Sequence, residues 1–270
     1  MATGNIDQQD TMEALDDYTS YSEEDDESGM TLVEHLEELR WRILKSLIAI
    51  AIGGIIAFIF RVQIMQFLTL PLPKTADSLT HGKLVVTGIA EGFTVFLKLA
   101  FAAGFVVALP VILYQVWAFI EPGLLPREKK HAVPFIMIGI ILFIAGLALG
   151  YVVLQYPVQW LVNFASGSFA EFVTADSYFT FVAFFLLAFG IVFEIPLILT
   201  FLSVIGLVGS DTLKRRRAYS HVGMWIAATF LTPGADIYSP VILGVAMSCL
   251  YELTILFIWF TKRSQGQLTE

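Results

Sequence analysis

Residues 35–60 read HLEELRWRILKSLIAIAIGGIIAFIF, and this stretch changes from charged to apolar at Ile43. Its apolar part comes close to the length of about 20 residues that a helix needs to cross the hydrocarbon core of a bilayer. Its charged part carries two arginines but also two glutamates. A membrane anchor needs only positive charge at this place. The stretch therefore predicts a transmembrane helix, and it leaves the acidic residues to be explained.

The composition is that of a membrane protein with an acidic tail. Of the 270 residues, 57% are hydrophobic and only 15% are charged, which is too apolar for an ordinary soluble domain. The formal net charge of −8 is misleading, because residues 1–29 hold ten Asp or Glu and no Lys or Arg. Without them, 14 acids and 16 bases remain. We expect 1–29 to be a disordered acidic tail.

Residues 30–262 are expected to form an all-α integral membrane domain, followed by a short cytoplasmic tail, 263–270. The hydrophobic segments do not alternate as the strands of a membrane barrel do, so helices are the spanning structure that fits. Six transmembrane helices are predicted, at approximately 43–60, 92–120, 134–156, 177–205, 219–231 and 240–260.

Basic residues set the orientation of these helices, since loops rich in Lys and Arg stay in the cytoplasm. One side of the predicted topology carries twelve bases and the other three. The twelve are Arg40, Arg42, Lys45, Arg127, Lys129, Lys130, Lys214, Arg215, Arg216, Arg217, Lys262 and Arg263. The three are Arg61, Lys74 and Lys83. Both termini are therefore expected in the cytoplasm.

The fifth segment, 219–231, is short. Its thirteen residues reach roughly 20 Å as a helix, against a hydrocarbon core of about 30 Å. Either it is re-entrant and pairs with the sixth segment, or it spans and the bilayer thins beside it.

The charged entrance to the first helix has two interpretations. Thr31 and Glu34 have the spacing of a capping box, and Glu38 and Arg42 have the i, i+4 spacing of an intrahelical ion pair. The first interpretation is an interfacial helix whose charges are solvated. The second is a carboxylate site for a basic peptide, because carboxylates and guanidinium groups pair as bidentate forks.

The loop IEPGLLPREKK, 120–130, offers further carboxylates at Glu121 and Glu128. Its prolines stiffen the backbone. This loop also has two interpretations. The first is an ordinary cytoplasmic loop with an excess of positive charge, which explains the bases; the second is the other half of the carboxylate site, which also explains Glu128.

Glu194 is the sharpest anomaly, because it lies roughly 15 Å along a helix from Val204 and therefore inside the hydrocarbon. An intramembrane carboxyl group is costly and usually faces a partner, a cavity or water. It could be protonated and hydrogen-bonded within the bundle, or it could face a groove that receives a substrate or partner helix. Pro196 predicts a kink, because it frees the carbonyl of Val192.

The outer loops carry residues that ordinarily mark turns and helix ends. Pro71 opens a PLP turn, Glu91 marks a helix start, and Asp236 in LTPGADIYSP, 231–240, is placed to cap the sixth helix. The four histidines are scattered, and we find no catalytic, metal-binding or nucleotide motif, so we expect neither an enzyme nor a cofactor nor a metal site. Nucleic-acid binding has no support, since topology explains the bases.

The motifs HLEELRWRI, PVILYQVWAFIEPGL, EKK, FGIVFEIP and LTPGAD, in this order over about 30–260, resemble the TatC family of the twin-arginine protein translocase. The resemblance implies a concave bundle of six helices in the bacterial cytoplasmic membrane. It further implies binding of signal peptides that carry consecutive arginines on folded cargo. The implied partners are TatA-like and TatB-like single-span proteins and further copies of the chain. Transport would be driven by the proton motive force without a nucleotide.

The resemblance also implies site residues. The signal-peptide site would comprise Glu38, Arg40, Phe119, Glu128, Lys129 and Lys130. Glu194 matches the polar residue that faces the groove. Pro71, Phe93 and Asp236 match an outer cap, although the turn at Asp236 is one residue longer than the family's pattern.

Two other classes of protein remain as alternatives. A secondary transporter or channel would use Glu194 as an ion or proton site. Such a protein would normally show an internal repeat and a second charge deep in the membrane, and we recognise neither in the sequence. An intramembrane enzyme would need a nucleophile and base at a sensible spacing, which we do not find.

Overall fold

The computed structural model describes residues 32–72, 84–123, 132–164, 173–204, 210–232 and 236–266. The described chain is almost entirely helical, with one isolated bridge between Val85 and Thr174 as its β pairing. The predicted all-α class is thereby confirmed. The chain forms two compact units, Met1–Leu44 and Lys45–Glu270. The predicted acidic tail and Thr31 lie outside the described residues.

Helix α2 (Leu32–Ile59) begins eleven residues before the apolar run, as expected of a helix that starts outside the membrane. A short helix that was not predicted, α3 (Arg61–Thr69), follows directly. In its apolar half, α2 crosses α4 (Glu91–Ile120) at glycines. A Cβ atom on Gly104 would lie only 2.5 Å from the backbone nitrogen of Gly54, so small residues permit this close backbone approach.

The predicted kink at Pro196 is present. Helix α8 (Ala175–Val192) ends, two residues form a turn, and α9 (Ile195–Val204) begins. The backbone nitrogen of Glu194 donates to the carbonyl of Ile191, which is a tighter bond than that of an α-helix. Because Pro196 has no N–H to continue the helical hydrogen bonds, the helix is interrupted at Glu194.

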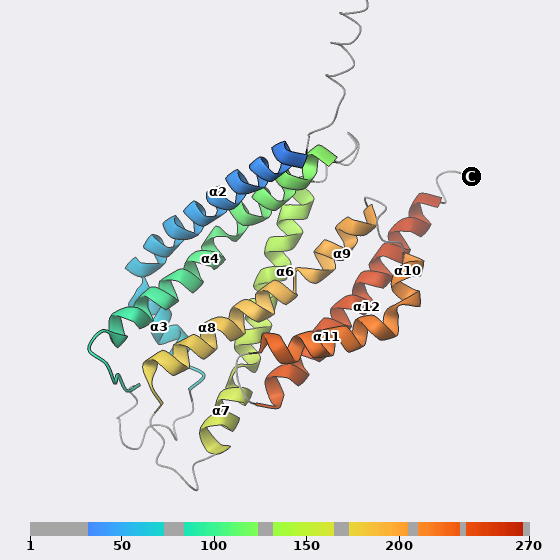
Figure 1. Ribbon diagram of the computed structural model, residues 1–270. Helices are drawn as coiled ribbons and strands as arrows, with labels where there is room; N and C mark the ends of the chain where they lie inside the picture. Colours follow the sequence, from blue (N-terminus) through green and yellow to red (C-terminus); the bar gives the residue numbers. More distant parts are fainter. Residues whose placement is uncertain are drawn as a thin grey trace, which may run out of the picture. The chain divides into compact units, whose positions relative to one another are not determined.

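The remaining helices are α6 (Ala132–Val153), α7 (Gln155–Phe164), α10 (Ser210–Arg215), α11 (Arg217–Leu231) and α12 (Tyr238–Gly266). Glu121–Gly123 form a 3₁₀ turn, η3, after α4. Figure 1 shows α11 and α12 as an antiparallel pair. Here Gly244 of α12 receives the ring of Trp225.

Five helical stretches of the described chain are long and apolar enough to cross a membrane. They are Val33–Ile59, Glu91–Gly123, Ala132–Phe164, Ala175–Ser203 and Tyr238–Trp259. Helix α11 has 15 residues and reaches about 22 Å, so it remains shorter than the hydrocarbon core.

Helix α8 provides much of the core and packs against both α4 and α6 (Figure 1). Its side chains Phe179, Val182, Phe185 and Phe189 are almost fully buried. On the facing helix, Phe143 of α6 fills the space over Gly190, where a Cβ atom would be only 2.6 Å from the ring. This central packing holds the break at Glu194 in place.

Candidate functional site

The entrance to the first helix contains the predicted ion pair. The Nε atom of Arg42 donates to Oε1 of Glu38 at 2.8 Å, and Nη2 bonds to the same oxygen. The ring of His35 stands 3.7 Å away from Oε2. That second oxygen is buried and has no hydrogen-bond partner among the described residues. One oxygen of Glu38 therefore binds a guanidinium group, and the other can still accept a hydrogen bond.

The other residues of the predicted peptide site are only partly described. Arg40 is exposed on α2, and Phe119 is half-buried near the end of α4. Glu128, Lys129 and Lys130 lie outside the described residues, so the proximity of Glu38 and Glu128 stays a prediction.

The carboxyl group of Glu194 lies where α4, α6 and α9 meet, and both its oxygens are buried without a hydrogen-bond partner in the described chain. A Cβ atom on Gly139 would lie 3.2 Å from Oε2 of Glu194 and 2.7 Å from a methyl group of Leu113. The internal hydrogen bond considered for Glu194 is thus not made to any described residue. Since leaving a buried polar group unpaired is costly, this carboxyl group needs a partner or a proton.

A second unpaired polar group lies on α4, one helical turn after Leu113. The indole nitrogen of Trp117 is buried without an acceptor in the described chain. Its ring packs on Phe135 of α6 at 5.0 Å and on Phe201 of α9 at 5.7 Å between centroids. The same three helices therefore hold an unpaired acceptor and an unpaired donor. The sequence does not reveal this role of Trp117, because tryptophans near the end of a span usually lie at the membrane interface.

The predicted outer residues lie at helix ends. Pro71 follows α3, and Phe93 is 61% exposed in the first turn of α4. Asp236 caps α12 as predicted, since its carboxylate accepts hydrogen bonds from the backbone nitrogen of Ser239 at 2.6 Å and from its hydroxyl at 2.7 Å. Pro73 lies outside the described residues.

Glu91 organises the start of α4. Its carboxylate accepts hydrogen bonds from the backbone nitrogens of Thr87 at 2.5 Å and Gly88 at 3.0 Å. Two turns further along, Lys98 donates to Asp176 of α8 at 2.6 Å and to Thr180 at 3.1 Å. These bonds join the N-terminal part of α4 to that of α8. Because the partners are about eighty residues apart, the sequence did not predict the Lys98 pair.

A polar cluster joins α11 and α12. Nε of Arg217 donates to Glu252 at 2.5 Å, and its Nη2 bonds to the other carboxylate oxygen. His221 lies 2.8 Å from Glu252 and 3.1 Å from the hydroxyl of Ser248. Glu252 falls within the predicted span 240–260, so the statement that no second deep charge exists is wrong. It is, however, already paired.

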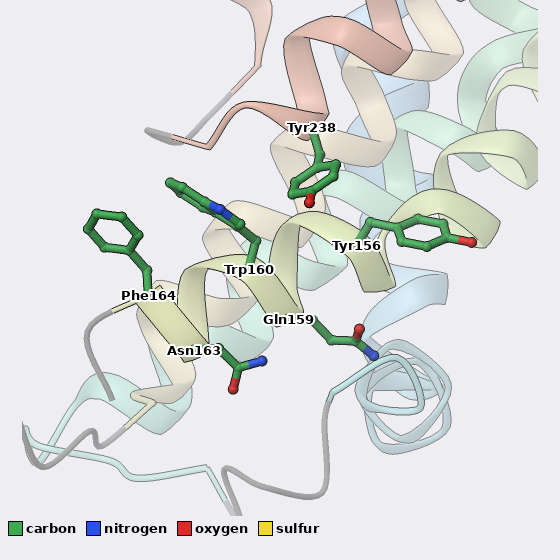
Figure 2. A pocket seen from close by; sticks show the side chains of 6 residues that line it. All are labelled: Tyr156, Gln159, Trp160, Asn163, Phe164 and Tyr238. Carbon is green, nitrogen blue, oxygen red and sulfur yellow. The ribbon is translucent and has the colours of Figure 1, made fainter. Parts of the chain in front are cut away.

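Two cavities lie away from these groups. A cavity of about 430 Å³ lies along α7 and is lined by aromatic rings and amides. Figure 2 shows Trp160 and Phe164 on α7 and Tyr238 of α12 directed towards that helix. The other cavity, of about 450 Å³, is apolar and lies among α3, α4, α6 and α8. Aromatic side chains are typical of membrane interfaces, which accounts for the first cavity.

These features define a polytopic helical membrane protein whose described residues place one unpaired carboxyl group within a span. Comparisons with known proteins identify the class. The family described as Sec-independent protein translocase protein (TatC) matches residues 34–245. Proteins of this name from Deinococcus radiodurans and Carboxydothermus hydrogenoformans are 37% and 36% identical. The first comparison covers 83% of the chain and 84% of the relative, and the second covers 88% and 96%.

The fold agrees with this match. A crystal structure described as the twin arginine translocase receptor TatC superposes with a TM-score of 0.71 at 32% identity. The superposition covers 85% of this chain and 100% of that chain. The chain belongs to the TatC family, and it is a component of the Sec-independent protein translocase. Members of this family are non-catalytic membrane components, so the expectation that the chain is not an enzyme is confirmed.

Proposed function

We propose that the chain is the receptor for twin-arginine signal peptides in its translocase, with Glu38 as one half of a carboxylate site and Glu128 as the other. The observation that carries this proposal is the Glu38–Arg42 pair, in which one carboxylate oxygen of Glu38 already accepts two hydrogen bonds from a guanidinium group and the other oxygen has no hydrogen-bond partner among the described residues. A signal-peptide arginine can replace Arg42 without a new kind of contact. The relative of known structure is itself described as a receptor.

Arginine specificity follows from the same geometry. A guanidinium group presents parallel donors that match a carboxylate, whereas a lysine ammonium is a point charge. Each charge-assisted hydrogen bond is worth roughly 1.5–3 kcal/mol when partly shielded. Arg40, Lys129 and Lys130 would discourage lone basic segments, and Phe119 would contact the apolar part of the peptide.

Within the translocase, the chain would act in the bacterial cytoplasmic membrane with both termini in the cytoplasm. It would form homo-oligomers and organise TatA-like and TatB-like single-span partners. The apolar part of the signal would extend towards Glu194, and Pro71, Phe93 and Asp236 would support the outer cap. Export of folded cargo would draw on the proton motive force.

Photocrosslinking tests the proposal. A photoreactive residue next to Glu38 and another next to Glu128 should both label a twin-arginine peptide, and a twin-lysine peptide should be labelled far less. Equal labelling of the two peptides would remove the proposed site. If the protein instead conducts protons in liposomes without any peptide, the transporter alternative gains support.

A further inference from the structure

We propose that Arg215 and Arg216, at the junction of α10 and α11, bind the phosphate headgroup of an anionic phospholipid. The sequence has four consecutive bases here, beginning with Lys214. The first and last of them contact α12. Lys214 lies over the ring of Trp259 at 5.8 Å, and Arg217 pairs with Glu252. The side chains of Arg215 and Arg216 are exposed and form no ion pair or hydrogen bond with a described residue.

The two free arginines are carried by an anchored element. Leu213 of α10 is buried against the cluster that includes Tyr251 and Ile255 of α12. The hydroxyl of Tyr251 also donates to the carbonyl of Leu213 at 2.9 Å. Because α10 is fixed to α12 on one side, the guanidinium groups that follow Leu213 occupy a restricted region instead of sweeping through the cytoplasm.

The depth of this region favours a lipid partner. Helices α11 and α12 meet at the turn before Tyr238, and Glu252 lies 14 residues, or about 21 Å, along α12 from that point. Trp259 lies 21 residues, or about 32 Å, from it. Arg215 and Arg216 lie between Lys214, which contacts Trp259, and Arg217, which pairs with Glu252. Since the hydrocarbon core is about 30 Å thick, they reach its boundary or lie inside it.

An unpaired guanidinium group at that depth is costly unless an anion meets it. Phosphate suits arginine, because its oxygens accept parallel N–H donors. The neighbouring acids do not neutralise these groups. Glu252 of α12 is held by Arg217 and His221, and the exposed Asp211 of α10 forms no ion pair with a described residue. Apolar surface for acyl chains is also present, because Leu253 and Leu256 of α12 are about half exposed. A phospholipid satisfies both requirements, whereas a soluble phosphate satisfies only one.

The test compares lipid binding to the full-length protein by native mass spectrometry. Wild type should bind phosphatidylglycerol more tightly than phosphatidylcholine. The double variant Arg215→Gln/Arg216→Gln should lose about 25-fold in phosphatidylglycerol affinity, at about fivefold per basic residue. Its phosphatidylcholine binding should not change. The variant Arg215→Lys/Arg216→Lys keeps the charge and should retain most of the preference.

Lys45→Gln provides the matched control, because Lys45 is an exposed base on α2. If it reduces the preference as much as the double Gln variant, the attraction is diffuse and the site does not exist. An unchanged preference in the double Gln variant has the same consequence. If soluble glycerol phosphate displaces phosphatidylglycerol completely, the residues form an anion site and the assignment to a lipid is wrong.

Discussion

A Cβ atom on Gly139 would lie 3.2 Å from Oε2 of Glu194, so the carboxyl group rests almost directly on the backbone of α6. The same atom would be 2.7 Å from Leu113 and 3.0 Å from Leu197. The space that a side chain would fill is thus occupied by three neighbours. The missing side chain of Gly139 lets a polar group remain buried where three helices meet.

Gly139→Val should therefore destabilise the protein by about 1–3 kcal/mol, because overpacking displaces these neighbours. Thermal unfolding in detergent measures the loss. Gly223→Val is the matched control, since a Cβ atom on Gly223 meets nothing within 4 Å and the change in helix propensity is the same. The cost should fall when Glu194 is also replaced by Ala. Equal losses at the two glycines would show that the crevice is not tightly packed.

Glu38→Ala should weaken binding of a twin-arginine peptide by roughly tenfold to a hundredfold, the equivalent of one charge-assisted hydrogen bond. Folding should remain intact, because the residue lies near the start of α2. Glu37→Ala serves as the control, as Glu37 is exposed on the same helix. Fluorescence anisotropy of a labelled peptide measures both. Peptide binding that is as strong in the Glu38 variant as in the Glu37 variant would exclude Glu38 from the site.

Glu194→Ala should reduce initial peptide binding less than Glu128→Ala does. The first contact is expected between arginines and the carboxylates outside the membrane, whereas Glu194 is buried among α4, α6 and α9. Anisotropy titrations on the two variants rank the effects. Complete loss of binding in the Glu194 variant would mean that the deep carboxyl group takes part in the first contact.

The cap of α12 gives a further prediction. Asp236→Ala should cost about 0.5–2 kcal/mol, because the backbone nitrogen and hydroxyl of Ser239 lose their acceptor. Asp236→Asn should recover part of this loss, since an amide oxygen still accepts. Chemical unfolding of both variants measures the difference. If the Asn and Ala variants unfold alike, the hydrogen bonds do not stabilise the helix start.

Local features of the fold could be predicted from the sequence, whereas contacts between residues that are far apart in the sequence could not. The kink at Pro196 and the pair of Glu38 with Arg42 follow from neighbours a few residues apart. The third span was predicted to end at Tyr156. A further helix, α7, continues to Phe164, since Pro157 is tolerated in its first turn.

The missed parts of the candidate sites depend on tertiary packing. Arg217 and Glu252 are 35 residues apart, so the sequence does not show that they pair. Glu252 could have been noticed, because it lies inside an apolar span and meets the same criterion that identified Glu194. The unpaired indole of Trp117 could not, since interfacial tryptophans are common and only its neighbours show that it is buried.

The pair of Arg217 and Glu252 allows a last, comparative prediction. Both oxygens of Glu252 bind the guanidinium group, and His221 adds a third contact. The pair of Lys98 and Asp176, in contrast, is joined by one hydrogen bond. Double-mutant cycles of alanine variants should therefore give a larger coupling energy for Arg217 and Glu252 than for Lys98 and Asp176.

The coupling of Lys98 and Asp176 should fall towards the low values typical of exposed pairs, a few tenths of a kcal/mol. Thermal unfolding in detergent at two salt concentrations measures both cycles. Both couplings should fall at high salt, because Arg217 is 56% exposed and the side chains of Lys98 and Asp176 are each about 40% exposed, and screening acts on solvent-exposed charges. A negligible coupling for Arg217 and Glu252 would mean that the packing of Trp225 against Gly244, and not this ion pair, fixes the position of α11.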